Sequence, residues 1–466
     1  GRRFDSRVLR ISSALILAVP MLMVLSAELK LAAEAAVWLS GWSLRQVHLL
    51  LFLALLVMLL PGGMRSLTWT GVAQGLAALL AVMVPVIIVA VIVTNMPVPQ
   101  LTHGPVLRAV GRNEAIQGLP IILPPALAFD LPGPELQPII KRFADAFGAV
   151  GPLAFVLATL STIAGVASAP WLLPRLAAAP AVYEARKTLG WATFLFGIAM
   201  LTSASAAVFM RDYLMDLIAM PGPANVPPWL ADLVQRGLAS ITETGTQFQV
   251  SSISFGRDGV IFGLPIAAQL PNVVLDLTLA GVLAGGLVAA GAAVVSLGQS
   301  LSEDLAFGLT WDPPHGATRL HVARVGIVIA AGLGVIGAAS LTADPMRLFL
   351  WALALSGSAL FPVLVLSIWW KRMNAYGAIA GVFTGYAVSG LAIIGGQASM
   401  LVIDGALAPV LGLPASAIAA MAGALVTPPP GRHLLELVRD VRVPGGEILY
   451  DREMRMQRLK KQRQLG

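Results

Sequence analysis

Two acidic residues lie within long apolar stretches of the sequence, where a charged side chain could carry a proton. Glu28 lies toward the C-terminal end of one apolar run with Lys30 close by, and Asp276 is the single charge between residues 271 and 297. A charge in a membrane core destabilises a helix by several kcal/mol unless it is paired or hydrated, which makes such residues candidates for function. The alternative is that both side chains reach the outer membrane surface or pair with Lys30.

Motifs for other chemistry are missing from the sequence. No phosphate-binding loop, HExxH motif or Ser-His-Asp arrangement occurs, and the five histidines are scattered along the chain. The absence of cysteine excludes disulfides, thiolate metal sites and a cysteine nucleophile. The sequence therefore predicts neither an enzyme nor a bound cofactor or metal.

The composition is that of an integral membrane protein. Of the 466 residues, 57% are hydrophobic and 12% charged, and the mean hydropathy is +0.82. An α-helix needs about 20 apolar residues to cross a bilayer. The sequence predicts ten such spans, at about 11–33, 46–60, 67–95, 148–169, 189–209, 264–300, 325–343, 347–370, 375–396 and 405–427.

The distribution of positive charge predicts the orientation of these spans. With the N-terminus in the cytoplasm, about two-thirds of the 31 lysines and arginines fall on the cytoplasmic side, as the positive-inside rule requires. Both termini are then cytoplasmic. The net charge of +7 indicates contact with the lipid bilayer, not with nucleic acid. The proline-rich segments 96–147 and 210–263 are predicted to be external loops.

Small residues predict two surfaces where helices approach one another closely. Residues 270–305 are rich in glycine and alanine, and we expect Gly285 and Ala289 to face other helices, not lipid. Gly377, Gly381 and Gly385, at a spacing of four, form a second stripe.

Four parts of the sequence carry a resemblance to a known family. They are LPN at 270–272 with SEDL at 302–305, PGGMRSLTW at 61–69, GVASAPWLLPRL at 165–176 with EARK at 184–187, and WKRMN at 370–374. Together they resemble the sodium:solute symporter family, in the branch that includes acetate permeases. Members have further helices upstream, so the resemblance implies that this chain is truncated at its N-terminus.

The resemblance implies an all-α membrane bundle of the five-plus-five inverted-repeat type. The transmembrane domain would span residues 1–427, with the last helices of the first repeat at 1–95 and the second repeat at 148–370. Two trailing helices would follow at 371–427, and a basic cytoplasmic tail would occupy 428–466.

The resemblance also implies where the ion and solute sites lie. In the family a Ser-Thr pair supplies hydroxyl ligands to sodium, and alignment places that pair on Val288 and Ala289, which cannot ligate a cation. Glu28 stands where related transporters commonly have a neutral glutamine. The candidates for the solute pathway lie on the fourth predicted span and just beyond it: Ser161, Thr162, Val166, Ser168 and Trp171. Val166 and Trp171 stand where the family has threonine and histidine.

The predicted function is secondary active transport of a small organic solute, such as a short monocarboxylate like acetate. The coupling ion would be sodium or a proton, and because the usual sodium ligands are missing, Glu28 and Asp276 are the candidates for proton coupling. The alternative is a transporter-like module that no longer moves solute and serves as a sensor or as the partner of a membrane or signalling protein. The predicted location is the bacterial inner membrane.

Overall fold

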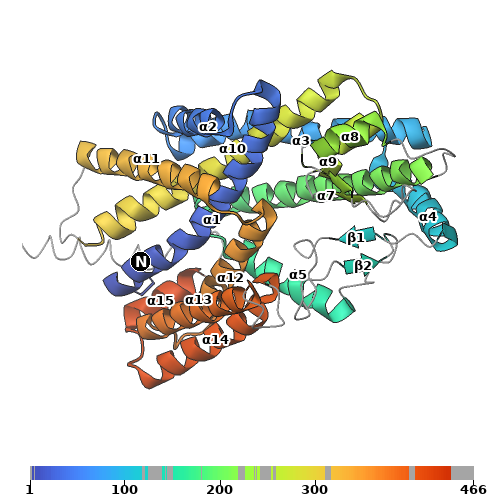
Figure 1. Cartoon of the computed structure of the whole chain (residues 1–466). Coiled ribbons are helices and arrows are strands. Elements are labelled where there is room, and N and C mark those ends of the chain that lie inside the picture. Colours follow the sequence, from blue (N-terminus) through green and yellow to red (C-terminus); the bar gives the residue numbers. More distant parts are fainter. Residues whose placement is uncertain are drawn as a thin grey trace, which may run out of the picture. The chain divides into compact units, whose positions relative to one another are not determined.

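The computed structural model describes residues 3–4, 6–117, 121–123, 139–141, 143, 151–179, 181–218, 226–235, 237, 239–241, 253–255, 259–309, 316–397 and 405–441. Helices make up most of this part of the chain (Figure 1). Their bounds are α1 (Arg7–Ser40), α2 (Leu44–Leu59), α3 (Met64–Thr94), α4 (Pro99–Gln117), α5 (Gly151–Ala167), α6 (Leu173–Ala177), α7 (Val182–Ile218), α8 (Pro228–Gln235), α9 (Gly259–Ala267), α10 (Asn272–Gln299), α11 (Ala317–Ser340), α12 (Pro345–Trp369), α13 (Ala375–Gln397), α14 (Pro409–Val426) and α15 (Arg432–Val441).

Short irregular elements complete the described residues. A π-helical segment, Ser300–Ala306, continues α10, and a 3₁₀ turn, Gly405–Leu407, precedes α14. Two antiparallel hairpins pair β1 (Ile121–Leu123) with β2 (Ile139–Lys141), and β3 (Ala239–Ile241) with β4 (Ile253–Phe255).

Each of the ten predicted spans coincides with an apolar helix. Among the described residues, eight helices are long and apolar enough to cross a membrane, while α2 and α5 are apolar but shorter. The 16 residues of α2 give a length of about 24 Å, against a hydrocarbon core of about 30 Å.

The predicted span at 264–300 was wrong at its N-terminal end. The structure divides this stretch into α9 and α10, with a break at residues 268–271. Gln269 adopts a left-handed conformation, with φ of 50°, and Pro271 follows it directly before α10 begins. Because proline lacks the backbone N–H that a continuing helix would use, the chain restarts as a new helix at Asn272.

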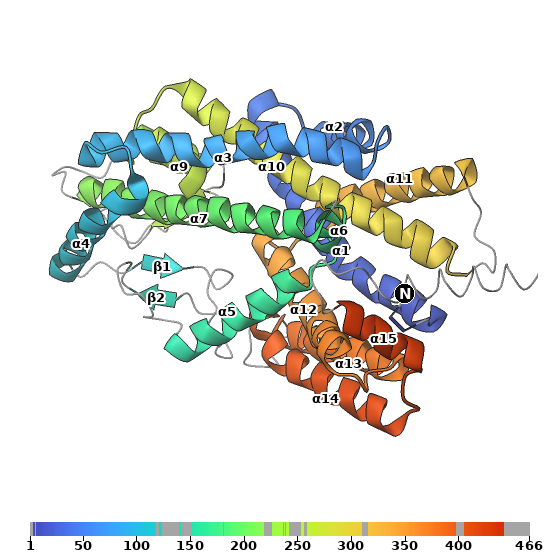
Figure 2. The ribbon, with the colours of Figure 1, turned by 180° about the vertical axis from the view of Figure 1, so that it is seen from behind.

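The prediction that 96–147 and 210–263 are loops was also wrong in part. These segments contain α4, α8, α9 and both hairpins (Figure 2), and α7 extends to Ile218. The apolar side of α4 is buried through Val106 and Val110, which belong to the same hydrophobic cluster as residues of α3 and α7. A possible short helix at 143–150 lies outside the described residues beyond Phe143.

The chain forms two compact units, each assembled from separate stretches of sequence. Unit 1 contains Gly1–Ser26, Leu157–Leu189 and Ala292–Gly466, and unit 2 contains Ala27–Val156 and Gly190–Gly291. The long helices α1, α5, α7 and α10 each contribute residues to both units.

In unit 2 the small residues of α10 pack as predicted. A Cβ atom at Gly281 would lie 2.7 Å from the carbonyl oxygen of Ala77 on α3, and one at Gly285 would lie 3.2 Å from the Cβ of Ala78. Ala289 is half-buried. The expectation that this surface faces another helix is therefore confirmed at Gly285.

In unit 1 the core lies among α12, α13 and α14, which pack side by side (Figure 1). A Cβ atom at Gly377 would lie 2.6 Å from the carbonyl oxygen of Ala420 on α14, and one at Gly381 would lie 2.8 Å from the Cβ of Ala420. Gly385 meets the backbone of Ser358 on α12. The predicted glycine stripe is thus confirmed, because it lets α13 approach both neighbours at backbone distance.

Candidate functional site

Unit 1 contains a cavity of about 560 Å³ with walls from α1, α10 and its π-helical extension, α12 and α15. Ser6, directly before α1, lines it together with Arg10, Ser13, Leu17 and Met21 on one face of α1. Steps of three and four residues place these side chains on one side of the helix. The wall is therefore polar near the start of α1 and apolar further along the helix.

The wall opposite is built by the end of α10. Ser296, Gln299, Ser300 and Asp304 line the cavity, and the spacing of four residues places Ser296 on the same side of the helix as Ser300 and Asp304. The last two belong to the π-helical segment, and π turns inside α-helices are frequent at functional sites. The cavity thus lies between two helices, each of which presents hydroxyl groups and one charged residue, Arg10 on α1 and Asp304 on the extension of α10.

An ion pair joins these two walls. Arg10 Nε donates a hydrogen bond of 2.7 Å to Asp304 Oδ1, and Arg10 Nη2 donates one of 2.6 Å to the carbonyl oxygen of Glu303. The side chains are 38% and 39% exposed. An ion pair this accessible contributes at most about 1 kcal/mol, so it can open readily.

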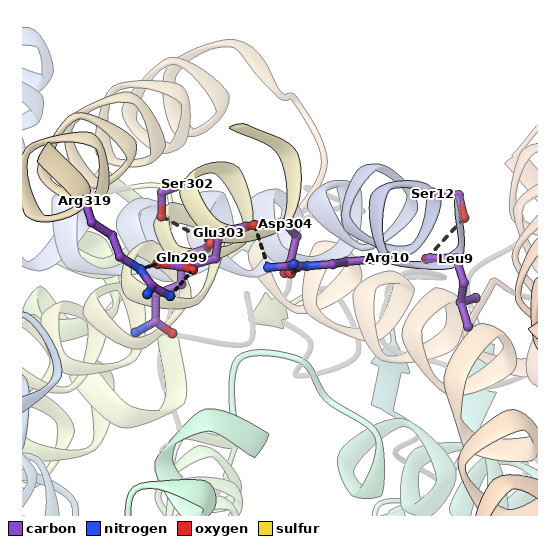
Figure 3. Close-up of polar contacts among 8 residues, drawn as sticks. All are labelled: Leu9, Arg10, Ser12, Gln299, Ser302, Glu303, Asp304 and Arg319. Atoms are coloured by element: carbon purple, nitrogen blue, oxygen red, sulfur yellow. Dashed lines mark hydrogen bonds and ion pairs between the residues drawn. The ribbon is translucent and has the colours of Figure 1, made fainter. Parts of the chain in front are cut away.

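The neighbouring acidic residue is paired from the other side. Arg319 of α11 donates to both carboxylate oxygens of Glu303, at 2.7 Å and 2.5 Å. Figure 3 shows Arg10 and Arg319 reaching the π-helical segment from opposite sides. Of these two adjacent ion pairs, the Arg10–Asp304 pair lines the cavity and the Arg319–Glu303 pair does not.

Two polar groups on the cavity wall lack a hydrogen-bond partner among the described residues. The hydroxyl of Ser296 is one, and this side chain is only 6% exposed. Nη1 of Arg3 is the other; the rest of that guanidinium donates to the carbonyl oxygens of Ser367 and Met373, at 3.2 Å and 2.9 Å. Burial lowers the pKa of Arg3, but arginine still retains its proton at neutral pH.

The short helix α15 closes part of the cavity. Leu437 and Val438 line it, and Val438 is 3% exposed. The three prolines at 428–430 and Gly431 end α14 and turn the chain back, so that α15 packs against α12. The part of the predicted tail beyond residue 441 lies outside the described residues.

The positions aligned with the family's sodium ligands contact an apolar surface in unit 2. Val288 and Ala289 lie on α10 and are half-buried. A Cβ atom at Gly71 of α3 would lie 2.9 Å from a methyl carbon of Val288. The side chain of Val288 is thus packed against the α3 backbone, with a methyl group where a hydroxyl ligand was expected from the resemblance.

Glu28 lies beside the same part of α10 as these positions, in unit 2. A Cβ atom at Gly286 would lie 3.0 Å from the carbonyl oxygen of Glu28, so α1 crosses α10 just before Val288. Glu28 is half-buried, whereas Asp276 is exposed. Asp276 is ten residues before Gly286, or about 15 Å along the helix axis. The structure therefore does not bring the two acidic candidates together.

The candidates for the solute pathway make structural contacts within unit 1. Ser161, Ser168 and Trp171 are buried, whereas Thr162 and Val166 are exposed. The hydroxyl of Ser168 donates to the carbonyl oxygen of Ala164 at 2.7 Å, and the Trp171 ring lies 6.4 Å from that of Phe349 on α12.

The cavity wall includes the helix-breaking prolines Pro170 and Pro174, but none of these five pathway candidates. The residues that do line it, Arg10, Ser296 and Asp304, were not assigned a role from the sequence. Asp304 belonged to the SEDL motif, which was the available signal.

The family model described as Sodium:solute symporter family matches residues 1–385. The chain belongs to the sodium:solute symporter family. It is an all-α integral membrane protein, in agreement with its apolar helices. The two curated relatives below are described as a symporter and a transporter.

An uncharacterized symporter of Cupriavidus necator is 28% identical over 244 residues, which cover 51% of this chain and 35% of that protein. The monocarboxylic acid transporter of Corynebacterium glutamicum is 27% identical over 316 residues, which cover 62% of this chain and 49% of that protein. This symporter-family chain therefore spans half or less of the length of these relatives.

A solved structure shows the same fold. It is that of a sodium-coupled sialic acid symporter in a substrate-bound outward-open state. The TM-score is 0.61 at 16% identity, and the match covers 92% of this chain and 76% of the other. At this identity the likeness concerns the arrangement of helices that the sodium:solute symporter family shares.

Proposed function

We propose that this protein is a secondary active transporter of a short monocarboxylate such as acetate, driven by protons and not by sodium bound at the family's usual site. The substrate class is supported by the resemblance to acetate permeases and by the relative described as a monocarboxylic acid transporter. A cavity of about 560 Å³ lies within the range of ordinary small-molecule sites.

One observation carries the choice of ion. Val288 packs a methyl group against Gly71 at the position aligned with a sodium ligand, while the carboxylate-bearing residue Glu28 lies at the same level of unit 2. A sodium ion that moved from water to the apolar surface at Val288 would lose polar contacts without replacement, which is unfavourable. A proton needs one titratable group and no coordination shell, so Glu28 can replace the missing ligands.

The orientation proposed is the one with both termini in the cytoplasm of a bacterial inner membrane. It rests on the positive-inside distribution of lysine and arginine. In this orientation the start of α1, with Arg3 and Arg10, lies toward the cytoplasm. The membrane domain then ends near residue 427, and the basic tail follows on the same side.

A second candidate function is a membrane module that senses or binds a partner without moving solute. It is favoured by the loss of polar groups at Val166, Trp171, Val288 and Ala289, where the resemblance implies hydroxyl or imidazole groups. Trp171 is buried against Phe349, which gives it a packing role in place of a polar one.

Counterflow separates the two candidates. Proteoliposomes containing the full-length protein are loaded with unlabelled pyruvate and diluted into labelled pyruvate, whose neutral form leaks through lipid less than acetic acid does. A transporter is expected to accumulate label transiently, at several times the level of protein-free liposomes, because exchange needs no ion gradient. Label that never exceeds the protein-free level, for pyruvate and for acetate, would favour the non-transporting module.

A further inference from the structure

We propose that the cavity in unit 1 binds a small carboxylate anion, which takes the place of Asp304 on Arg10. The inference rests on the proposed monocarboxylate transport and assigns the solute a binding site that does not include Val288 or Glu28, the residues argued for the coupling ion. Arg10, Asp304 and Ser296 have no part in the proton coupling argued above.

The charges on the cavity wall favour an anion. Among the described residues that line the cavity, the charged ones are Arg3, Arg10 and Asp304, which leaves one positive charge in excess. Nη1 of Arg3 also has no hydrogen-bond partner among the described residues. A net positive charge inside a cleft with low-dielectric walls attracts anionic ligands.

Two serine hydroxyl groups line the cavity on the same helix face as Asp304, the partner of Arg10. Ser296, Ser300 and Asp304 lie four residues apart on one face of α10 and its extension, and all three line the cavity. The Ser296 hydroxyl is buried and has no partner in the described part of the chain. A buried donor without an acceptor is unfavourable, so a carboxylate that accepts this hydrogen bond is stabilised there.

The bond between Arg10 and Asp304 can be exchanged. Asp304 receives a hydrogen bond from Nε of Arg10, and both side chains are more than a third exposed. A second bond, from Arg10 Nη2 to the carbonyl oxygen of Glu303, holds the guanidinium in place when Asp304 leaves. Arginine binds free carboxylates with the same geometry as it binds aspartate, so solute and Asp304 compete for one partner.

If acetate and Asp304 compete for Arg10, removing the Asp304 carboxylate strengthens acetate binding. A purely structural ion pair would not have this effect. Isothermal titration calorimetry of acetate into the purified full-length protein is expected to show roughly tenfold tighter binding in Asp304→Asn, because the competing carboxylate is gone. Arg10→Gln is expected to weaken binding at least tenfold. The double variant Arg10→Gln/Asp304→Asn is expected to bind as weakly as Arg10→Gln, which separates loss of the site from loss of folding.

Matched controls come from the adjacent residues. Arg319→Gln breaks the neighbouring ion pair with Glu303 from the side that lies outside the cavity wall, and acetate affinity is expected to stay within twofold of wild type. Ser296→Ala is expected to weaken binding several-fold. Ser302→Ala removes an equally buried hydroxyl that bonds to the carbonyl oxygen of Gln299, and is expected to leave binding unchanged.

The outcomes distinguish this inference from the proposed function. Acetate affinity in Asp304→Asn that equals or falls below wild type, or no acetate binding in either protein, would overturn the carboxylate site. If the affinities change as expected but counterflow is absent, the carboxylate site at Arg10 is supported and the proposed transport is contradicted. If counterflow is normal while all variants bind acetate alike, the proposed transport is supported and the carboxylate site at Arg10 is contradicted.

Discussion

Replacing Glu28 with glutamine is expected to abolish pH-driven uptake of a short monocarboxylate while leaving the protein folded. Glu28 is half-buried on α1 where that helix crosses α10 at Gly286. Glutamine has the same size as glutamate but cannot release or take up a proton near neutral pH. The initial rate of labelled pyruvate uptake by proteoliposomes under an imposed pH gradient is expected to fall to the level of protein-free liposomes.

Asp276→Asn is the matched control for this result. Asp276 also lies in an apolar stretch, but it is exposed and about 15 Å along α10 from the crossing with α1. Its neutral variant is expected to retain most of the pH-driven uptake. Wild-type uptake in Glu28→Gln would remove Glu28 from the coupling mechanism, and loss confined to Asp276→Asn would assign the proton to Asp276 instead.

Replacing Arg211 with methionine is expected to destabilise unit 2 by about 3–5 kcal/mol. Nε and Nη2 of Arg211 on α7 both donate to one oxygen of Glu114 on α4, at 2.9 Å and 2.6 Å. The two side chains are 5% and 0% exposed. Removing the arginine leaves a buried carboxylate without its main counter-charge, which explains the size of the effect.

The thermal unfolding midpoint of the purified protein in detergent measures this effect. Glu114→Gln/Arg211→Met is expected to recover most of the loss, because no buried charge remains. Arg319→Gln breaks the more exposed pair with Glu303 and is expected to leave the unfolding midpoint nearly unchanged, because water screens an exposed ion pair. Equal losses in Arg211→Met and Arg319→Gln would contradict the role assigned to burial.

Hydropathy was sufficient to predict the helices that are long and apolar enough to cross a membrane, because bilayer thickness imposes a minimum apolar length. It missed α4, whose sequence is largely polar and which buries only a few residues such as Val106 and Val110. It also merged α9 with α10, because the four residues between them form too short a break for a hydropathy window to resolve.

The site was less predictable than the fold. Glu28 could be selected from its residue type alone, but its level with Val288 depends on how α1 crosses α10 at Gly286. The pairing of Arg10 with Asp304 joins residues 294 positions apart. Ser296 sits in an apolar helix and could not be distinguished from other small residues until its lack of a partner was seen.

The central claim is that protons drive transport and that sodium does not act through Val288 and Ala289. The direct measurement compares uptake of labelled pyruvate by wild-type proteoliposomes under a pH gradient in sodium-free buffer with uptake under a sodium gradient at equal pH. We predict accumulation well above protein-free liposomes in the first condition and none in the second. Accumulation driven by the sodium gradient, with no response to the pH gradient, would contradict the account.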